Sequence, residues 1–145
     1  MQTKEILRIK GNALFTVAPE ERLGEAIAAM VEQDIGSLVV MDRGRLHGML
    51  TFREVLKALH GEGEGARARA VSRFMVSDPL TVGPDVEMDE LRRLMLDTHT
   101  RYVPVMEGST LVGVLSFHDV AKAVLEEQSF ENRMLKGYIK NWPDE

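Results

Sequence analysis

Gly48-Met-Leu-Thr-Phe-Arg-Glu54 and Gly113-Val-Leu-Ser-Phe-His-Asp119 are the two stretches of sequence that decide the fold. They lie 65 residues apart (113 − 48), and the same offset relates Thr16-Val-Ala-Pro19 to Thr81-Val-Gly-Pro84. The offset holds without a gap between these motifs. Because chance similarity does not keep one register over such a length, the chain contains an internal duplication.

Both copies show the same order of periodicities. Apolar residues at helical spacing predict a first helix over residues 23–31 in one copy and 88–95 in the other. A predicted hairpin and a second helix follow, over residues 37–41, 46–50 and 53–60 in the first copy and 102–106, 111–115 and 118–127 in the second. With a first strand that ends at Thr16-Val17 or Thr81-Val82, each unit is β-α-β-β-α.

A single unit of this kind leaves one apolar face of its sheet open. We therefore predict an α+β fold in which two β-α-β-β-α repeats pack sheet to sheet in a pseudo-two-fold arrangement. The predicted domains are residues 1–62, the first repeat with an N-terminal lead-in, and residues 73–128, the second repeat. Residues 63–72 are rich in glycine and charge, which predicts a flexible linker.

The tail, residues 129–145, is predicted to form a C-terminal amphipathic helix. Phe130, Met134, Leu135, Tyr138 and Ile139 recur at helical spacing, Trp142 extends the pattern, and Pro143 ends it. The helix could fold onto the core of its own chain. Because aromatic residues are enriched at interfaces, we favour a homodimer to which this helix contributes.

The composition limits the classes of partner and compartment. The chain has 145 residues, a net charge of -5 and no cysteine. The acidic balance argues against nucleic acid or an anionic membrane surface as a partner, and the lack of cysteine excludes disulfides and thiolate metal sites. The sequence has no membrane-spanning apolar run and no signal peptide, so we expect a cytoplasmic protein.

Catalytic and metal-binding motifs are missing from the sequence. Ser116, His118 and Asp119 lie at the start of one predicted helix and point in different directions, so they do not form a nucleophile–base–acid relay. The four histidines lack metal-ligand spacing, and neither a Gly-x-x-x-x-Gly-Lys-Ser/Thr phosphate loop nor a Gly-x-Gly-x-x-Gly fingerprint occurs. We therefore expect no enzyme, no metal site and no catalytic cofactor.

The duplicated motifs resemble those of the tandem cystathionine-β-synthase (CBS) domain family, whose paired domains form a regulatory unit called a Bateman module. The resemblance rests on Thr-Val-x-Pro, on Arg101-Tyr-Val-Pro-Val-Met106, and on Gly-h-h-Ser/Thr-x-x-acid (h, hydrophobic). It covers nearly the whole chain, including the lead-in Ile6–Gly11. It implies a signal-transduction module that binds an adenine nucleotide (AMP, ADP, ATP or NAD) and acts on a separate effector protein.

In this family the Ser/Thr-x-x-Asp motif binds the ribose and phosphate of adenosine ligands, which implies roles for the second copy of the motif. The Asp119 carboxylate accepts hydrogen bonds from both ribose hydroxyls. Ser116 lies where the free N–H groups and positive end of a helix favour a phosphate. The expected adenine slot consists of Tyr102, Val103 and Pro104, with Thr81 opposite them.

Basic side chains are the expected phosphate partners. Arg53 and His118 occupy equivalent positions, one residue before each acid, where the family often places a basic group. Arg101 and Lys10 are further candidates. The remaining candidates are the first-copy residues Thr16, Ser37, Thr51 and Glu54.

The same motif has a purely structural interpretation. Ser/Thr-x-x-Asp/Glu before an apolar helix is also a capping box, whose two side chains satisfy the first N–H groups of the helix. For Thr51 to Glu54 we favour the cap, because the longer glutamate side chain misplaces the carboxylate for a diol. For Ser116 to Asp119 we favour the ligand, so one site should bind better than its sibling. The alternative function is a structural dimerisation module with vestigial sites.

Overall fold

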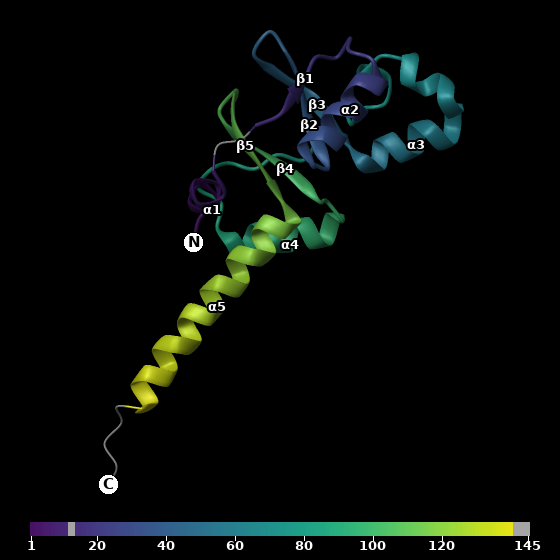
Figure 1. The fold of residues 1–145 in the computed structure, drawn as a ribbon. Helices are drawn as coiled ribbons and strands as arrows, with labels where there is room; N and C mark the ends of the chain where they lie inside the picture. The colour runs from purple at the N-terminus through teal and green to yellow at the C-terminus, as the bar shows by residue number, and fades with distance from the viewer. Residues whose placement is uncertain (12–13, 141–145) are drawn as a thin grey trace.

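The structure is a computed structural model and describes residues 1–11 and 14–140 (Figure 1). Its fold is α+β, as predicted, with two similar units. The first unit contains β1 (Thr16–Val17), α2 (Leu23–Gln33), β2 (Ser37–Asp42), β3 (Arg45–Thr51) and α3 (Phe52–Glu62). The second contains α4 (Met88–Thr98), β4 (Tyr102–Glu107), β5 (Thr110–Ser116) and α5 (Phe117–Lys140). Helix α1 (Thr3–Lys10) precedes both.

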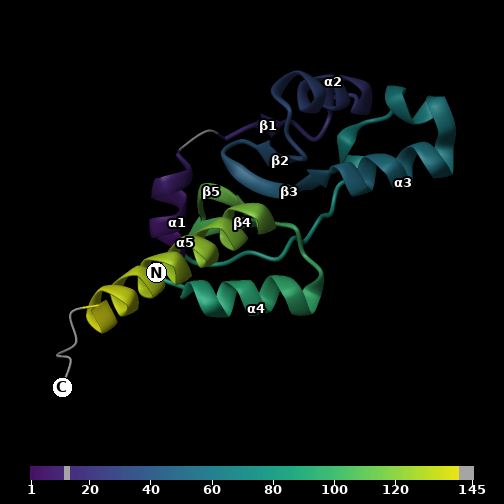
Figure 2. The same cartoon turned by 60° about the horizontal axis from the view of Figure 1, so that its bottom comes forward.

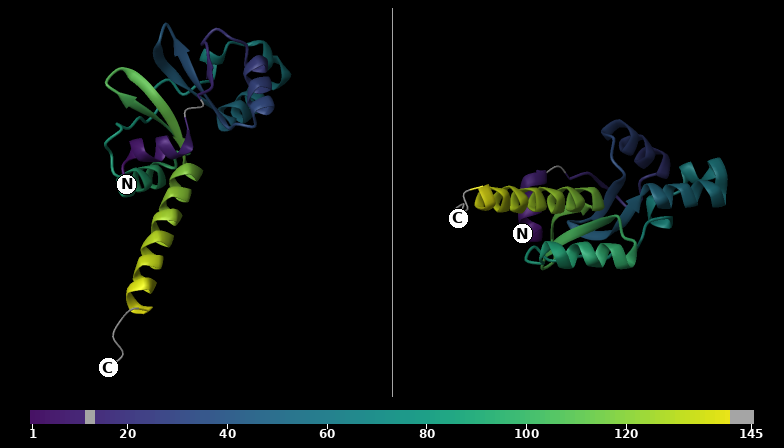
Figure 3. Two further views of the ribbon diagram at one scale, coloured as in Figure 1. Left: turned by 60° about the vertical axis from the view of Figure 1, so that its left-hand side comes forward. Right: turned by 90° about the horizontal axis from the view of Figure 1, so that it is seen from below.

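The two hairpins have the same register at the offset of the sequence repeat. In β2–β3, Ser37 lies opposite Thr51, and in β4–β5, Tyr102 lies opposite Ser116. Figure 3 shows the hairpins side by side, with α2 and α3 beyond one and α1, α4 and α5 beyond the other. Strands β3 and β5 are in contact, so the sheets of the two units meet. This is the predicted pseudo-two-fold packing.

The first strand of the second unit is shorter than predicted. In the first unit the Val39 amide donates to the Phe15 carbonyl at 3.1 Å, beside strand β1. The residue equivalent to Val39 is Pro104, which has no N–H and cannot make this bond. Residues 81–82 therefore form a single parallel bridge, Val82 to Val105, instead of the predicted strand.

Each unit completes its core with the segment that precedes the other unit. Ile6 of α1 is buried in the core of the second unit, and its equivalent, Val71, is buried in the core of the first. These segments cross the sheets at Gly48 and Gly113, where an added Cβ would clash with the Val76 carbonyl and would lie 2.8 Å from the Leu7 side chain, respectively. Figure 2 shows α1 beside β5 and α5, far along the chain from it. The lead-in predicted for the first unit thus packs on the second.

The segment predicted as a flexible linker is folded. Two 3₁₀ helices, η1 (Gly63–Ala68) and η2 (Val71–Arg73), follow α3 directly. The side chains of Ala66 and Val71 are fully buried in the first core. The Arg73 guanidinium also donates to both carboxylate oxygens of Glu62, at 2.8 to 3.1 Å. The prediction of flexibility rested on the many glycines and charged residues of this segment. It gave no weight to Ala66 and Val71, which anchor the segment in the core.

The second helix of the second unit and the predicted tail helix are one element. Helix α5 runs unbroken from Phe117 to Lys140, and its later turns extend away from both units (Figure 1). Phe130, Met134 and Leu135 are 57%, 62% and 57% exposed, so the tail does not fold onto its own core. The end of the predicted segment, with Trp142 and Pro143, lies outside the described residues. None of the helices described, α5 included, has the length and apolar character needed to cross a bilayer.

The exchange of segments predicts that residues outside the first repeat hold its core together. Replacing the fully buried Val71 with alanine should lower the free energy of unfolding by about 2 kcal/mol. The control, Val31→Ala, changes a valine that is 75% exposed and should cost less than about 0.5 kcal/mol. Urea denaturation measures both. Equal midpoints for the two variants would mean that the 71–73 turn does not support the first unit.

Candidate ligand-binding site

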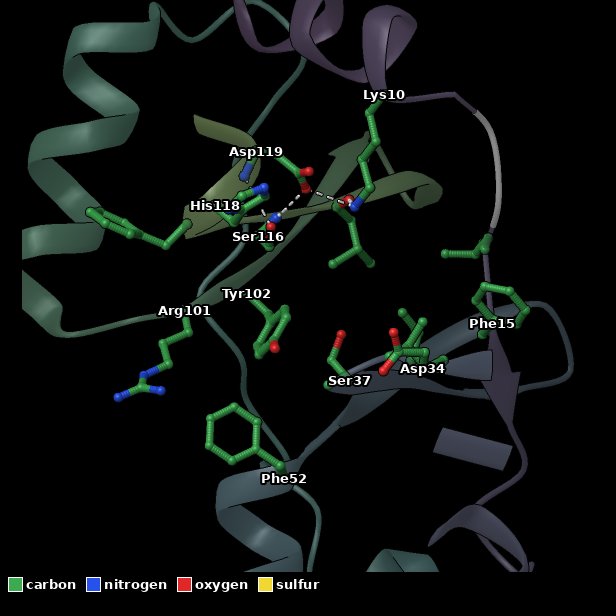
Figure 4. Close-up of a pocket in the computed structure, with 16 residues that line it drawn as sticks. Lys10, Phe15, Asp34, Ser37, Phe52, Arg101, Tyr102, Ser116, His118 and Asp119 are labelled. Atoms are coloured by element: carbon green, nitrogen blue, oxygen red, sulfur yellow. Dashed lines mark hydrogen bonds and ion pairs between the residues drawn. The ribbon is translucent and has the colours of Figure 1, made fainter. Parts of the chain in front are cut away.

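A cavity with a volume of about 750 Å³ lies between the two units (Figure 4). Its walls come from the end of α1, the start of β2, the end of β5 and the start of α5. Figure 4 shows Asp119 and Lys10 on one side, Ser37 and Asp34 on the other, and Tyr102 between them. The lining residues are Lys10, Leu14, Phe15, Asp34, Ile35, Gly36, Ser37, Val39, Phe52, Arg101, Tyr102, Val114, Ser116, Phe117, His118 and Asp119.

Asp119 is the most constrained polar side chain of this cavity. Its Oδ2 accepts a hydrogen bond from the Ser116 amide at 2.8 Å and lies 2.8 Å from the Lys10 ammonium. The Ser116 hydroxyl in turn accepts from the Asp119 amide at 3.1 Å. The two residues therefore form the capping box that the structural interpretation predicts. All contacts found for this carboxylate among the described residues fall on Oδ2, so capping and ligand binding by Oδ1 are compatible.

The protonation of two cavity residues is shifted by their surroundings. Burial alone would raise the pKa of Asp119, but hydrogen bonds from Lys10 and Ser116 outweigh it and hold that pKa below its usual value. Burial raises the pKa of Tyr102, against the opposing effect of Arg101. At neutral pH the cavity thus presents a carboxylate at Asp119 and a neutral phenol at Tyr102.

A second, smaller cavity of about 200 Å³ is the pseudo-two-fold mate of the first. Thr51 and Glu54 stand there in place of Ser116 and Asp119. Glu54 is only 9% exposed, and its Oε1 accepts from the Thr51 amide at 3.1 Å and the Thr51 hydroxyl at 2.6 Å. This capping box agrees with the prediction that the cap dominates at the first motif. The smaller volume and the buried acid make this cavity the poorer candidate.

Three side chains separate the two cavities and line both: Phe52, Arg101 and Tyr102. The rings of Phe52 and Tyr102 meet edge to face with centroids 6.4 Å apart, and the Arg101 guanidinium lies 5.3 Å from the Phe52 centroid. The Tyr102 hydroxyl lies directly over Gly36, so a Cβ at residue 36 would displace the tyrosine ring. The aromatic pair is therefore a fixed partition between the cavities.

The structure divides the predicted site residues between these cavities. The larger cavity is lined by Lys10, Ser37, Arg101, Tyr102, Ser116, His118 and Asp119. The smaller cavity is lined by Thr51, Arg53, Glu54, Arg101 and Tyr102. Neither lining includes Thr16, Thr81, Val103 or Pro104. Val103 and Pro104 are buried within the second unit, whereas Thr16 and Thr81 are exposed.

Of the predicted adenine slot, only Tyr102 lines the larger cavity. We predicted that it would come from residues 81 and 102–104 of the same unit, but β2 of the opposite unit faces Asp119 across the cavity (Figure 4). The reason is the pseudo-two-fold axis, which places the end of β5 against the start of β2. Sequence reasoning missed Phe15, Asp34 and Gly36. The equivalence of Ser37 to Tyr102 was the available signal, since it identifies the strand that serves the opposite motif.

The charges of the larger cavity are mixed. Lys10, Arg101 and His118 contribute basic side chains, and Asp34 and Asp119 contribute acids. Within residues 1–11 and 14–140, no group of three or more histidine or acidic side chains is arranged to hold a metal ion. The arrangement suits a ligand that combines an apolar ring, hydroxyl groups and an anion.

Fold and cavities together define a tandem repeat module with one pocket for each copy at the junction. The CBS domain family matches residues 6–61 and 71–126, and the chain therefore belongs to the CBS-domain family. CBSX3, a mitochondrial CBS domain-containing protein of Arabidopsis thaliana, is 28% identical over 126 residues. These residues are 83% of this chain and 61% of the relative, so the chain spans about three fifths of that protein.

Solved structures share the fold over most of the chain. The CBS-domain containing protein ATU1752 of Agrobacterium tumefaciens is 33% identical, with a TM-score of 0.81 over 85% of this chain and 98% of that one. CBSX2 in complex with AMP is 24% identical, with a TM-score of 0.75 over 88% and 98%. The CBS domain pair of MJ0100, in complex with 5′-methylthioadenosine and S-adenosyl-L-methionine, is 21% identical, with a TM-score of 0.77 over 88% and 98%.

The lowered pKa of Asp119 predicts a pH-dependent contribution to stability. The pKa of Asp119 is lower in the folded than in the unfolded protein, so the ionised carboxylate stabilises the fold. This stabilisation is fully present at pH values above the unfolded pKa and is lost as the pH falls through the folded pKa. Asp119→Asn should lower the free energy of unfolding by roughly 1 kcal/mol at neutral pH, because it removes a charge-assisted hydrogen bond that solvent partly screens. The difference from wild type should shrink as the pH is lowered. Urea midpoints at several pH values measure it, and a difference independent of pH would contradict this assignment.

Proposed function

We propose that this protein is a regulatory sensor that binds an adenine nucleotide, such as AMP, ADP, ATP or NAD, in the larger cavity between its two CBS domains. The observation that carries the proposal is Asp119. It is an ionised acid at the start of a helix, held by Ser116 and Lys10 at the edge of a cavity of about 750 Å³. A carboxylate in this position can accept hydrogen bonds from a ribose diol.

The rest of the cavity supports the other parts of such a ligand. Phe15, Ile35 and Tyr102 provide apolar and aromatic surface for a purine ring. The N-terminus of α5 and the basic side chains of Lys10 and His118 favour an anionic group. Two proteins of the same fold, CBSX2 and MJ0100, have been solved with adenosine compounds bound, which agrees with this ligand class.

The proposed output is regulatory and passes to a separate effector protein. A ligand can shift the module between states only by its differential affinity for them, and the junction of the two units is where such a difference can arise. The cavity joins residues of both units, so its occupancy reports on their relative position. We propose no chemical reaction for this cavity and no catalytic cofactor.

A structural dimerisation module with vestigial sites is the second candidate function. The exposed apolar side chains of Phe130, Met134 and Leu135 on the projecting part of α5 favour it. The same surface supports our expectation of a homodimer. The two functions are compatible, and only ligand binding separates a sensor from a purely structural module.

Thermal unfolding in the presence of nucleotides tests the proposal. A ligand at a hundred times its dissociation constant adds about 2.7 kcal/mol of stability, which is a clear shift in melting temperature. AMP, ADP, ATP and NAD should include at least one compound with this effect, and GMP serves as the guanine control. If none of the adenine compounds shifts the melting temperature at millimolar concentration, the structural module is the better description.

Matched substitutions in the two copies locate the site. Asp119→Ala should abolish most of the nucleotide-induced shift, because it removes the proposed ribose acceptor. Glu54→Ala changes the equivalent acid of the smaller cavity and should preserve the shift, although it removes the contacts of Glu54 to Thr51. An equal loss of response in the two variants would refute the assignment of the ligand to the larger cavity.

A further inference from the structure

Lys10 is the one residue of the lead-in helix that reaches the Asp119 carboxylate among the residues described. Its ammonium lies 2.8 Å from Asp119 Oδ2 and donates to the Val114 carbonyl at 2.6 Å. The Lys10 side chain is 31% exposed and borders the larger cavity, as Figure 4 shows. It thus touches the acid that the proposed function assigns to the ribose.

The position of Lys10 is fixed by contacts that do not involve Lys10 itself. The Thr3 amide and hydroxyl both donate to the Val86 carbonyl, at 2.9 and 2.8 Å, and the Lys4 amide donates to the Pro84 carbonyl. Ile6 is 2% exposed within the second core. Helix α1 therefore stays docked whatever the Lys10 side chain does, and the ammonium is free to move within the reach of its four-carbon stem.

Resting on the proposed function, we propose that Lys10 selects adenosine ligands that carry an anionic phosphate over neutral ones. The 5′-phosphate of a nucleotide lies on the same sugar as the hydroxyls proposed to bind Asp119, so it is within the screening length of about 8 to 10 Å at which the two anions repel each other. The Lys10 ammonium is positively charged and attracts both anions. Phosphate binding therefore depends on Lys10.

Neutral ligands experience the opposite effect. The Lys10 ammonium contacts Oδ2 of Asp119, so a ribose diol that uses both carboxylate oxygens shares Oδ2 with it, whereas Oδ1 is open to a single hydroxyl. A neutral adenosine compound gains nothing from the ammonium and competes with it for the carboxylate. Removal of the ammonium therefore weakens phosphate-bearing ligands and leaves neutral ones unchanged or improved.

The chain itself suggests the substitution that tests this role. Met75 occupies the position equivalent to Lys10 beside the other copy of the motif and packs against the first core. Lys10→Met thus introduces a side chain that the repeat already tolerates at this position. Lys10→Arg keeps the charge, and Lys4→Met is the matched control, since Lys4 lies on the same helix and pairs with Asp85 at the surface.

Calorimetric titration with AMP and with adenosine measures the selectivity. Wild type, Lys4→Met and Lys10→Arg should bind AMP more tightly than adenosine. Lys10→Met should lose about tenfold or more in affinity for AMP, the loss expected for a charge-assisted hydrogen bond. Its affinity for adenosine should be unchanged or higher.

The outcomes separate this inference from the proposed function. If Lys10→Met binds AMP as tightly as wild type does, or loses AMP and adenosine affinity to the same extent, the selective role of Lys10 is overturned while the site itself stands. If wild type binds neither compound, this inference is overturned, and the proposed function fails as well only if ADP, ATP and NAD also leave the melting temperature unchanged.

Discussion

The exchange of lead-in segments between the two units is the constraint on which the rest of the structure depends. Ile6 fills the core of the second unit and Val71 fills the core of the first, so neither repeat is complete by itself. Because both segments must cross the sheets, a side chain at Gly48 would clash with the backbone of Val76, and one at Gly113 would displace the Leu7 side chain. The exchange fixes the sheets against each other and places the start of β2 opposite the end of β5. It also brings Lys10 to Asp119.

The two cavities differ because the duplicated sequences have diverged at the junction. Asp119 stands where the first copy has Glu54. Both acids cap a helix, but Asp119 also borders the larger cavity, whereas Glu54 is buried. Tyr102 replaces Ser37 and fills space between the cavities, so the volume near the first motif is small and the volume near the second is large. Pseudo-symmetric packing with asymmetric side chains thus produces two cavities of different size and lining.

The repeat pattern predicted the fold well, because hydrophobic periodicity and the constant offset are local properties of the sequence. The helices and hairpins of both units follow it. The composition of residues 63–72 predicted a flexible linker, and this prediction was wrong. Burial of Ala66 and Val71 in the first core orders the segment despite its glycines. The site was predicted only in part. Asp119 and Ser116 belong to one motif, but Ser37 and Phe15, which line the same cavity, come from the opposite unit. The repeat pointed to Ser37, whereas Phe15 carries no motif and is found only from the three-dimensional arrangement.

A crystal structure of the protein grown with AMP tests the central claim most directly. The account predicts one nucleotide for each chain, in the larger cavity, with its ribose hydroxyls on the Asp119 carboxylate and its purine ring against Phe15, Ile35 or Tyr102. Electron density for AMP at Glu54 alone, or equally in both cavities, would contradict the asymmetry. A larger cavity that stays empty in crystals grown with AMP, and likewise with ADP, ATP or NAD, would contradict the sensor function itself.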